Sequence, residues 1–142
     1  MRQALALADE AEQRGEVPVG AVVVMDGIVT GRGGNATIAH NDPTAHAEML
    51  ALREAAQAIG SYRLTGATVY VTMEPCAMCA GALVTARVGR LVFGTRDLRF
   101  GAVRSKFRIA DSDLLNHRME ITEGVLAADC LRRLQRFFAE RR

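Results

Sequence analysis

The spacing of apolar residues predicts four helices along the chain. At its start, Leu5, Ala8 and Ala11 recur every three residues, as on one buried helical face, and Gly15 follows as a stop signal. Thr44 precedes a second periodic segment and is a candidate N-cap, because its hydroxyl oxygen can accept from the free amides of a first turn. The helices are expected at residues 2–14, 45–59, about 76–86 and 126–140.

Runs of β-branched and apolar residues between these helices predict five strands. Val19–Met25 and Ile28–Arg32 flank Asp26-Gly27, a dipeptide typical of a tight hairpin turn, and residues 33–43 are expected to form a loop. Strands that alternate with helices predict an α/β domain with a mixed sheet, antiparallel at the first hairpin and parallel after the helical crossovers. The remaining strands are expected at residues 67–72, 90–94 and 118–122.

Composition supports a single globular domain spanning residues 1–142. Hydrophobic residues make up 49% of the chain, and a domain of this length buries roughly 70% of the surface that its unfolded chain exposes. The longest apolar run, Val19–Met25, is far shorter than the roughly 18 residues of a membrane span, and no secretory leader is apparent. Only three cysteines are present, so we expect a cytoplasmic location without disulfide bonds.

Formal charge is unevenly distributed, although its sum is only +2. Residues 1–86 carry five basic and nine acidic groups, whereas residues 87–108 carry seven basic groups and a single acid, Asp97. A block of like charge is most often a solvated face. A basic stretch is also typical of a phosphate-binding surface, so residues 87–108 are a candidate contact for nucleic acid.

Two short segments combine potential metal ligands. Cys76 and Cys79 are three residues apart, so on a helix both thiols face the same side and can bind one ion. Each segment opens a predicted helix, where the helix N-terminus favours thiolates and where ligand sites of open α/β sheets gather. With His46 as the third ligand, a tetrahedral ion keeps one position for water, which is typical of catalytic zinc; iron or cobalt would also suit these ligands.

Three other residues are candidates for a fourth ligand, which would close the site and make the metal structural. Cys130 falls on the predicted buried face of the last helix, where a small apolar role is expected. His40 lies in a polar loop and His117 follows Asn116, so each is expected at the surface or in a hydrogen bond. We therefore expect His46, Cys76 and Cys79 to be the ligands.

Glu48 is the candidate proton carrier of this site. It lies two residues beyond His46, about 200° around an ideal helix, so it is not expected to bind the ion directly. At a helix end its carboxylate can still reach a water on the ion, whose pKa a zinc ion lowers to about 7, and can act as a general base and acid. The alternative is a solvated glutamate that the helix dipole favours.

These motifs resemble a known superfamily. The H-x-E and P-C-x-x-C patterns around His46 and Cys76 are similar to those of the zinc-dependent cytidine/deoxycytidylate deaminases. Within that superfamily the chain is most similar to the branch that deaminates adenosine in tRNA, and the similarity covers nearly the whole chain. The segments that carry it are residues 16–22, 41–48, 62–64, 71–76, 92–97, 116–118 and 120–124.

The resemblance implies a three-layer α/β/α cytidine-deaminase-like fold with a mixed five-stranded sheet, and a homodimer. It implies hydrolytic deamination of adenosine to inosine at the wobble position of a tRNA anticodon stem-loop, typically of an arginine tRNA. One Zn²⁺ per subunit would be held by His46, Cys76 and Cys79, and Glu48 would move the protons.

The same resemblance implies a set of substrate contacts. Asn35 matches the asparagine that hydrogen-bonds the flipped base, and the turn containing Pro18 and Val19 matches the pocket wall. Asp97 matches an acid beside the substrate strand, where it can accept from a ribose 2′-OH. Structural roles are the alternatives: Asn35 suits a turn, Pro18 can start a strand, and Asp97 can pair with Arg96 or Arg99.

The basic stretch favours RNA over a free nucleoside, because a stem-loop presents a row of phosphates and a nucleoside does not. Arg99 and Arg104 are expected to contact those phosphates. The chain departs from the family at Val103-Arg104, where small residues are usual. Two other functions stay open at this point: a deaminase of free guanine, cytosine or cytidine with the same fold, and a non-enzymatic RNA-binding module with a structural zinc.

Overall fold

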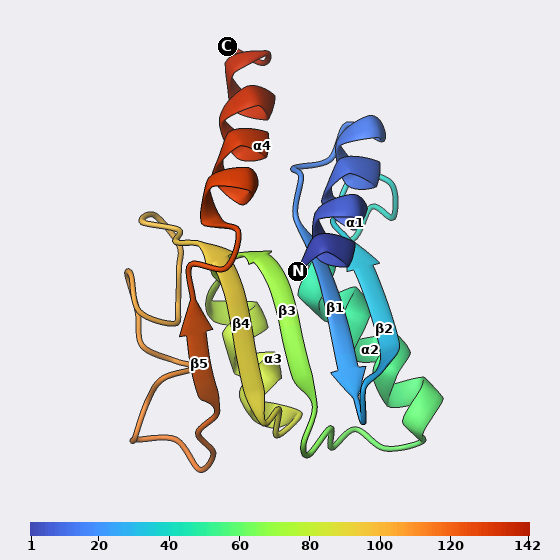
Figure 1. Ribbon diagram of the computed structural model, residues 1–142, viewed down its shortest axis with the longest axis vertical. Coiled ribbons are helices and arrows are strands. Elements are labelled where there is room, and N and C mark those ends of the chain that lie inside the picture. The colour runs from blue at the N-terminus through green and yellow to red at the C-terminus, as the bar shows by residue number, and fades with distance from the viewer.

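The computed structural model describes all 142 residues and contains a five-stranded sheet with four helices. The strands are β1 (Gly20–Met25), β2 (Ile28–Gly34), β3 (Thr68–Met73), β4 (Arg90–Thr95) and β5 (Glu120–Glu123). The helices are α1 (Arg2–Gln13), α2 (Ala47–Ile59), α3 (Ala77–Thr85) and α4 (Ala127–Ala139). The strand order is β2-β1-β3-β4-β5 (Figure 1). The number and type of the elements and their order along the chain agree with the sequence prediction.

The sheet is mixed, with one more antiparallel pair than predicted. β1 is antiparallel to β2, whereas β3, β4 and β5 are parallel to one another. β1 is also antiparallel to β3, although the sequence predicted antiparallel pairing only at the hairpin. After β2 the chain crosses through α2 and returns on the other side of β1, so β3 runs parallel to β2 and therefore opposite to β1.

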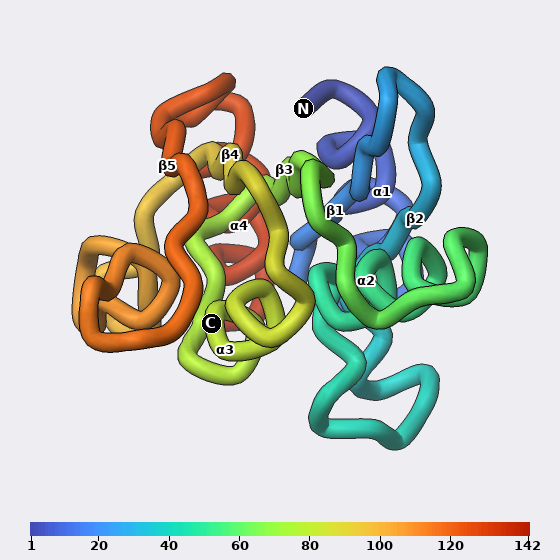
Figure 2. The backbone as a smooth tube through the Cα atoms, turned by 90° about the horizontal axis from the view of Figure 1, so that it is seen from below, coloured from blue at the N-terminus to red at the C-terminus, as the bar shows by residue number.

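The helices form two layers that enclose the sheet. α2 and α3 cover one face, and α1 and α4 lie on the other (Figures 1 and 2). Glycines allow this close packing: a Cβ at Gly31 of β2 would lie 2.1 Å from the Ala51 carbonyl oxygen of α2. A Cβ at Gly20 of β1 would lie 2.0 Å from the Ala4 carbonyl oxygen of α1. The absence of a side chain at these two glycines thus lets α1 and α2 pack against the sheet by backbone contact.

Ion pairs join α1 to α4 across a sequence separation of 124 residues. The Arg133 guanidinium donates to both carboxylate oxygens of Asp9 at 2.6 and 2.9 Å. Arg136 pairs in the same way with Glu12. The first and last helices therefore form one continuous layer.

Thr44 does not cap α2, contrary to the prediction. The helix begins at Ala47, two residues later than expected, and the Thr44 hydroxyl instead donates to Asp42 Oδ1 at 2.7 Å. Asn35 Oδ1 takes the capping role, because it accepts from the Ala47 amide at 2.9 Å. Other boundaries differ from the predicted ones by one or two residues; β2 continues to Gly34, and β5 begins at Glu120.

Each of the four helices is too short or too polar to cross a lipid bilayer.

Candidate active site

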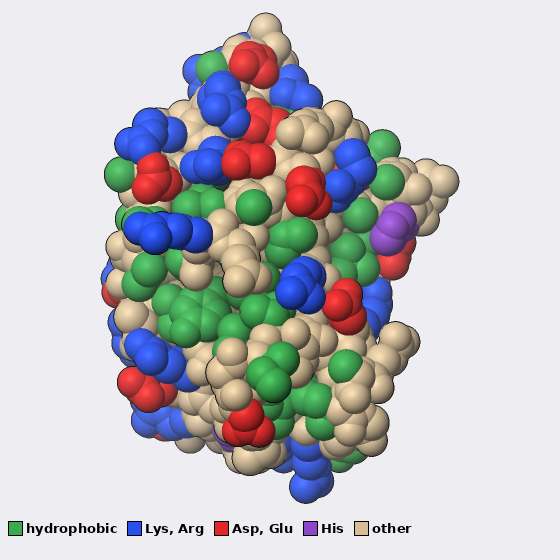
Figure 3. Space-filling model, turned by 45° about the vertical axis from the view of Figure 1, so that its right-hand side comes forward, with side chains coloured by type: hydrophobic (Ala, Val, Ile, Leu, Met, Phe, Trp, Pro, Cys, Tyr) green, Lys and Arg blue, Asp and Glu red, His purple; other side chains and the backbone are tan.

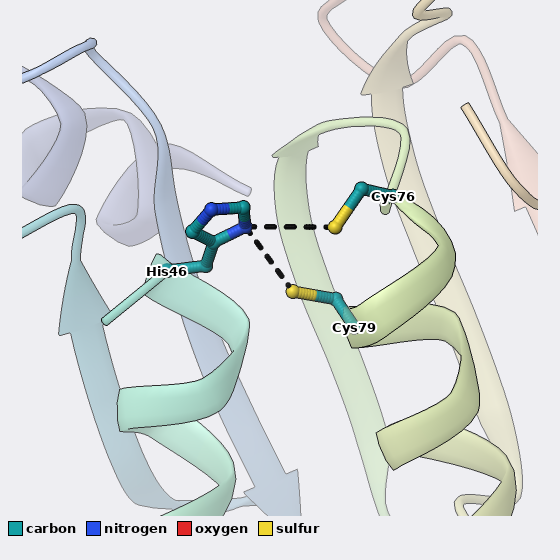
Figure 4. Close-up of side chains that lie close together, drawn as sticks. All are labelled: His46, Cys76 and Cys79. Atoms are coloured by element: carbon teal, nitrogen blue, oxygen red, sulfur yellow. Dashed lines mark hydrogen bonds between the residues drawn. The ribbon is translucent and has the colours of Figure 1, made fainter. Parts of the chain in front are cut away.

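His46, Cys76 and Cys79 converge at the point where two helices begin (Figure 4). His46 is the N-cap residue of α2, Cys76 is the N-cap residue of α3, and Cys79 lies in the first turns of α3. His46 Nδ1 lies 3.6 Å from Cys76 Sγ and 3.5 Å from Cys79 Sγ. Around a tetrahedral zinc ion a nitrogen and a sulfur ligand lie about 3.6 Å apart, so the three donors already have the spacing of a zinc site.

The three donors influence one another's protonation. Hydrogen bonds with Cys79 and, to a smaller extent, with His46 lower the pKa of the Cys76 thiol to about 4. The hydrogen bond to Cys76, together with burial, raises the pKa of the Cys79 thiol. Two adjacent thiolates repel each other, and a divalent cation between them would remove that penalty. The hydrogen bond between His46 and Cys76 also raises the pKa of the His46 imidazole.

Glu48 is buried beside these donors without joining them. Its side chain belongs to the first turn of α2 and is only 4% exposed. Burial raises the pKa of its carboxyl group to about 7, where the group can both accept and donate a proton near neutral pH. The solvated-glutamate alternative is therefore wrong for this residue.

A cavity of about 290 Å³ opens over the metal-ligand cluster. This volume is near the lower end of the range for ligand pockets and suits a small planar group rather than a large ligand. The sequence-predicted residues Val19, Asn35, Glu48, Asp97 and Arg99 all line it. Its other lining residues are Val17, His46, Met73, Glu74, Cys76, Phe100 and Phe138.

Two predicted contact residues lie outside this cavity. Pro18 is fully buried, so it shapes the wall through Val17 and Val19 on either side of it. Arg104 does not line the cavity, and its guanidinium pairs with Asp111 at 3.3 Å and with Glu123 at 3.2 Å.

Asn35 and Asp97 line the cavity and also accept hydrogen bonds from backbone amides. Asn35 Oδ1 accepts from the Ala47 amide, which leaves the side-chain NH₂ group of Asn35 free to donate. Asp97 Oδ1 accepts from the amides of Arg99 at 3.0 Å and Phe100 at 3.1 Å. Asp97 does not pair with the guanidinium of Arg96 or Arg99, and Arg96 pairs with Glu123 instead at 2.7 Å.

The basic stretch is largely neutralised by acids that follow it in sequence. Arg90 pairs with Glu120, and other arginines of the stretch pair with Asp111 and Glu123. Basic and acidic side chains are likewise interspersed on the face shown in Figure 3. No ion pair includes Arg99 or Lys106. Arg87 also forms no ion pair and bonds only to Asn116, so of the three unpaired cations of the stretch Arg99 alone lines the cavity.

Two buried glutamates that the sequence analysis did not single out position the cavity loops. Glu74, 2% exposed, accepts from the amides of Asp97, Val103, Arg104 and Ser105 and from the Ser105 hydroxyl. Burial opposes ionisation of Glu74, but these hydrogen bonds lower its pKa overall. Glu16, 1% exposed, accepts from the amides of Ile38 and Ala39 and from the Thr37 hydroxyl. The one available signal was that Glu74 stands between the end of β3 and Pro75, and that Glu16 lies two residues before Pro18.

The alternative metal ligands lie elsewhere. His117 Nε2 donates to the Val88 carbonyl at 2.7 Å, and His40 is exposed in the loop before α2. Cys130 is 1% exposed and lies against Gly94, where a Cβ on that glycine would be 2.3 Å from Sγ. Both expectations, a hydrogen-bonded His117 and an apolar role for Cys130, are confirmed.

Comparison with known proteins agrees with this geometry. The chain matches the family model of the MafB19-like deaminases over residues 1–141. It is 52% identical to a tRNA-specific adenosine deaminase of Haemophilus influenzae, over all of this chain and 83% of that protein. It superposes on a solved tRNA:A34 deaminase, from work on A-to-I editing at the wobble position of transfer RNA, with a TM-score of 0.91, 44% identity and coverage of 94% and 97%.

A guanine deaminase of Bacillus subtilis is also similar, but over a smaller part of the chain. It shares 40% identity over 67% of this chain and 61% of its own, with a TM-score of 0.65. The expected three-layer deaminase fold is confirmed by these structures. Sequence identity of 52% over the whole of this chain, together with the matching fold, shows that the chain belongs to the family of tRNA-specific adenosine deaminases.

Proposed function

We propose that this protein converts adenosine to inosine hydrolytically at the wobble position of a tRNA anticodon. The observation that carries the proposal is the placement of Glu48, buried in one small cavity with His46 and Cys76, in a chain that matches tRNA-specific adenosine deaminases along its whole length. An arginine tRNA is the expected substrate.

We propose one Zn²⁺ per subunit, held by His46 Nδ1 and the sulfurs of Cys76 and Cys79. The spacing of these atoms supports zinc, since it matches a tetrahedral site with imidazole and thiolate ligands. When bound, zinc supplies a Lewis acid that makes a water molecule nucleophilic at neutral pH. Three protein ligands would leave a tetrahedral ion one position for that water.

Glu48 is proposed to move the protons of the reaction. Its carboxylate takes a proton from the attacking water and delivers it to N1 of the adenine ring as C6 gains oxygen. The second proton of the water then passes to the amino group, which leaves as ammonia, and inosine remains. A carboxyl group with a pKa near 7 is suited to both directions of this transfer.

The cavity walls are proposed to hold the base and its ribose. The free NH₂ group of Asn35 faces the cavity and can donate to an acceptor on the purine edge, while Val19 packs against the ring. None of the hydrogen bonds of Asp97 uses Oδ2, so this oxygen can accept from a ribose 2′-OH and favour RNA over DNA.

Arg99 is proposed to contact a phosphate of the anticodon stem-loop, because it lines the cavity and has no acidic partner. Arg104 stays a predicted RNA contact, and it would have to share its guanidinium with Asp111 and Glu123. We also propose that the protein is a homodimer, as the family resemblance implies, and that it works in the cytoplasm.

The decisive experiment compares inosine formation in an anticodon stem-loop with turnover of free adenosine, cytidine and guanine. We expect activity on the stem-loop and little on the free compounds. The Glu48→Gln variant should lose deamination while retaining one equivalent of zinc by elemental analysis. Robust guanine turnover without RNA activity would favour the guanine deaminase alternative, which the 40% identity to the Bacillus subtilis enzyme keeps open. Wild-type RNA binding with no turnover of any substrate would favour a non-enzymatic binding module.

A further inference from the structure

Exposed phenylalanines line the cavity and the hollow beside it. The chain contains only five phenylalanines. Three of them, Phe100, Phe107 and Phe138, are 64%, 51% and 48% exposed. Phe100 and Phe138 line the cavity itself. Leaving large apolar rings in water costs free energy, so their gathering at one place points to a ligand that covers them.

A second hollow adjoins the cavity along Phe100. It is lined by Ala77, Met78, Phe100 and Phe107, and it shares His46, Cys76 and Asp97 with the cavity. Phe100 therefore stands between the two spaces, with the cavity on one side and an apolar hollow on the other. A group bound in this hollow would lie directly beside the group that reacts.

The backbone that presents these rings is fixed on both sides. The Phe100 amide donates to Asp97 Oδ1 at 3.1 Å, and the next amide, of Gly101, donates to the Asp97 carbonyl at 2.9 Å. The Gly101 carbonyl in turn accepts from the amides of Lys106 at 2.9 Å and Phe107 at 3.0 Å. One closed loop thus holds Phe100 and Phe107 close together, so their exposure is a built feature of the fold.

Each of the two rings follows a cation without an acidic partner. Arg99 precedes Phe100 and Lys106 precedes Phe107, whereas most arginines nearby are in ion pairs. An aromatic ring beside a free cation is the arrangement that binds a single-stranded nucleotide: the base stacks on the ring and the phosphate approaches the cation.

We propose that Phe100 and Phe107 form a stacking subsite for one nucleobase that flanks the deaminated adenosine in the RNA. This inference rests on the proposed function, since the flanking base is present only when the substrate is RNA. The target base enters the cavity on one side of Phe100, and its neighbour stacks in the hollow on the other side. Met78 and Ala77 form the floor on which the neighbouring base lies.

The test is a cycle in which both the protein ring and the RNA base are removed. Dissociation constants are measured for an anticodon stem-loop and for two copies with an abasic nucleotide immediately 5′ or 3′ of the target. The protein carries Glu48→Gln so that the target stays unreacted. Base–aromatic stacking contributes about 1–3 kcal/mol per base, so Phe100→Ala should weaken binding of intact RNA about 5- to 150-fold. On one of the abasic RNAs the same substitution should change binding less than twofold.

Matched variants separate stacking from other effects. Phe100→Trp keeps a stacking face and should bind intact RNA within about threefold of the parent protein. Leu98→Ala removes another exposed apolar side chain of the same loop, 76% exposed and outside both spaces, and should leave all three dissociation constants unchanged. Phe107→Ala should resemble Phe100→Ala.

Two outcomes would overturn the subsite. The first is that Phe100→Ala does not weaken binding of intact RNA, or that it weakens binding of both abasic RNAs as much as binding of intact RNA. The other is dissociation of the homodimer by Phe100→Ala or Phe107→Ala in light scattering, which would make the rings a subunit contact. Because the cycle measures binding, it tests the stacking subsite even if the wild-type protein binds the stem-loop without deaminating it. That result would refute the proposed function and leave the subsite testable. Failure of wild-type protein to bind the RNA would overturn both.

Discussion

Removal of the buried carboxylate of Glu74 should destabilise the protein and disorder the loop beside the active site. Glu74 accepts five hydrogen bonds, from four backbone amides of residues 97–105 and from the Ser105 hydroxyl. No other side chain bonds to those four amides, so Glu74→Ala leaves all of them without their acceptor.

The size of the effect follows from where those amides lie. A hydrogen bond to a charged acceptor contributes about 1.5–3 kcal/mol. Val103 is fully buried, so its amide finds no water, whereas the amides nearer the surface recover part of the loss by solvation. We therefore expect Glu74→Ala to lower the free energy of unfolding by about 3–5 kcal/mol, a large part of the roughly 5–15 kcal/mol of a typical domain. Glu74→Gln, which keeps one acceptor oxygen, should cost less.

Urea denaturation measures the stability, and limited proteolysis measures the order of the loop. Glu54→Ala is the matched control, because Glu54 is exposed on α2 and forms no ion pair. Cleavage within residues 97–107 should rise in Glu74→Ala under conditions where the rest of the chain stays folded. If Glu74→Ala unfolds within about 1 kcal/mol of Glu54→Ala and the loop stays resistant, the reasoning from its hydrogen bonds is refuted.

Three further predictions concern other residues. Cys130→Ser should retain zinc and activity with a small loss of stability, and loss of stoichiometric metal by elemental analysis would show that the ligand set is wrong. Arg99→Glu should weaken binding of an anticodon stem-loop and reduce the slope of log K against log salt by about one; an unchanged slope would exclude a phosphate contact. The Arg96 guanidinium lowers the pKa of Glu123 to about 2, so the stabilisation that Glu123 provides is fully present above its unfolded pKa and is lost as pH falls through its folded pKa. The difference in unfolding free energy between wild type and Glu123→Gln should therefore be constant above about pH 5 and shrink below it; a difference that grows on acidification would contradict the assigned pair.

Local sequence patterns predicted the elements and the convergence of His46, Cys76 and Cys79. Burial periodicity depends on neighbouring residues, so the four helices and five strands were found with boundaries within two residues of the observed ones. His46, Cys76 and Cys79 were also predictable, because each helix N-terminus brings its own ligands and the fold needs only to place the two ends together. Residue type and spacing carried enough information for these features.

The features that the sequence could not reveal depend on contacts between distant residues. Thr44 looks like a cap, but Asn35 supplies the capping oxygen from twelve residues before Ala47. The basic stretch looks free until Glu123 folds back onto it from 27 residues beyond Arg96. The periodicity of the nearby sequence identifies neither Asn35 nor Glu123 as a partner. Each contact depends on how the folded chain brings distant segments together.

The ion pairs between α1 and α4 bear on when this protein can first work. α1 leaves the ribosome before the other elements and α4 after them, since synthesis proceeds from the N-terminus. Until α4 emerges, Asp9 and Glu12 lack their arginine partners and one face of the sheet is only half covered. Phe138 of α4 also lines the cavity, so the candidate metal ligands His46, Cys76 and Cys79 are synthesised before the last residue of the cavity wall. The wall of the cavity is therefore complete only once the last helix has docked against the first.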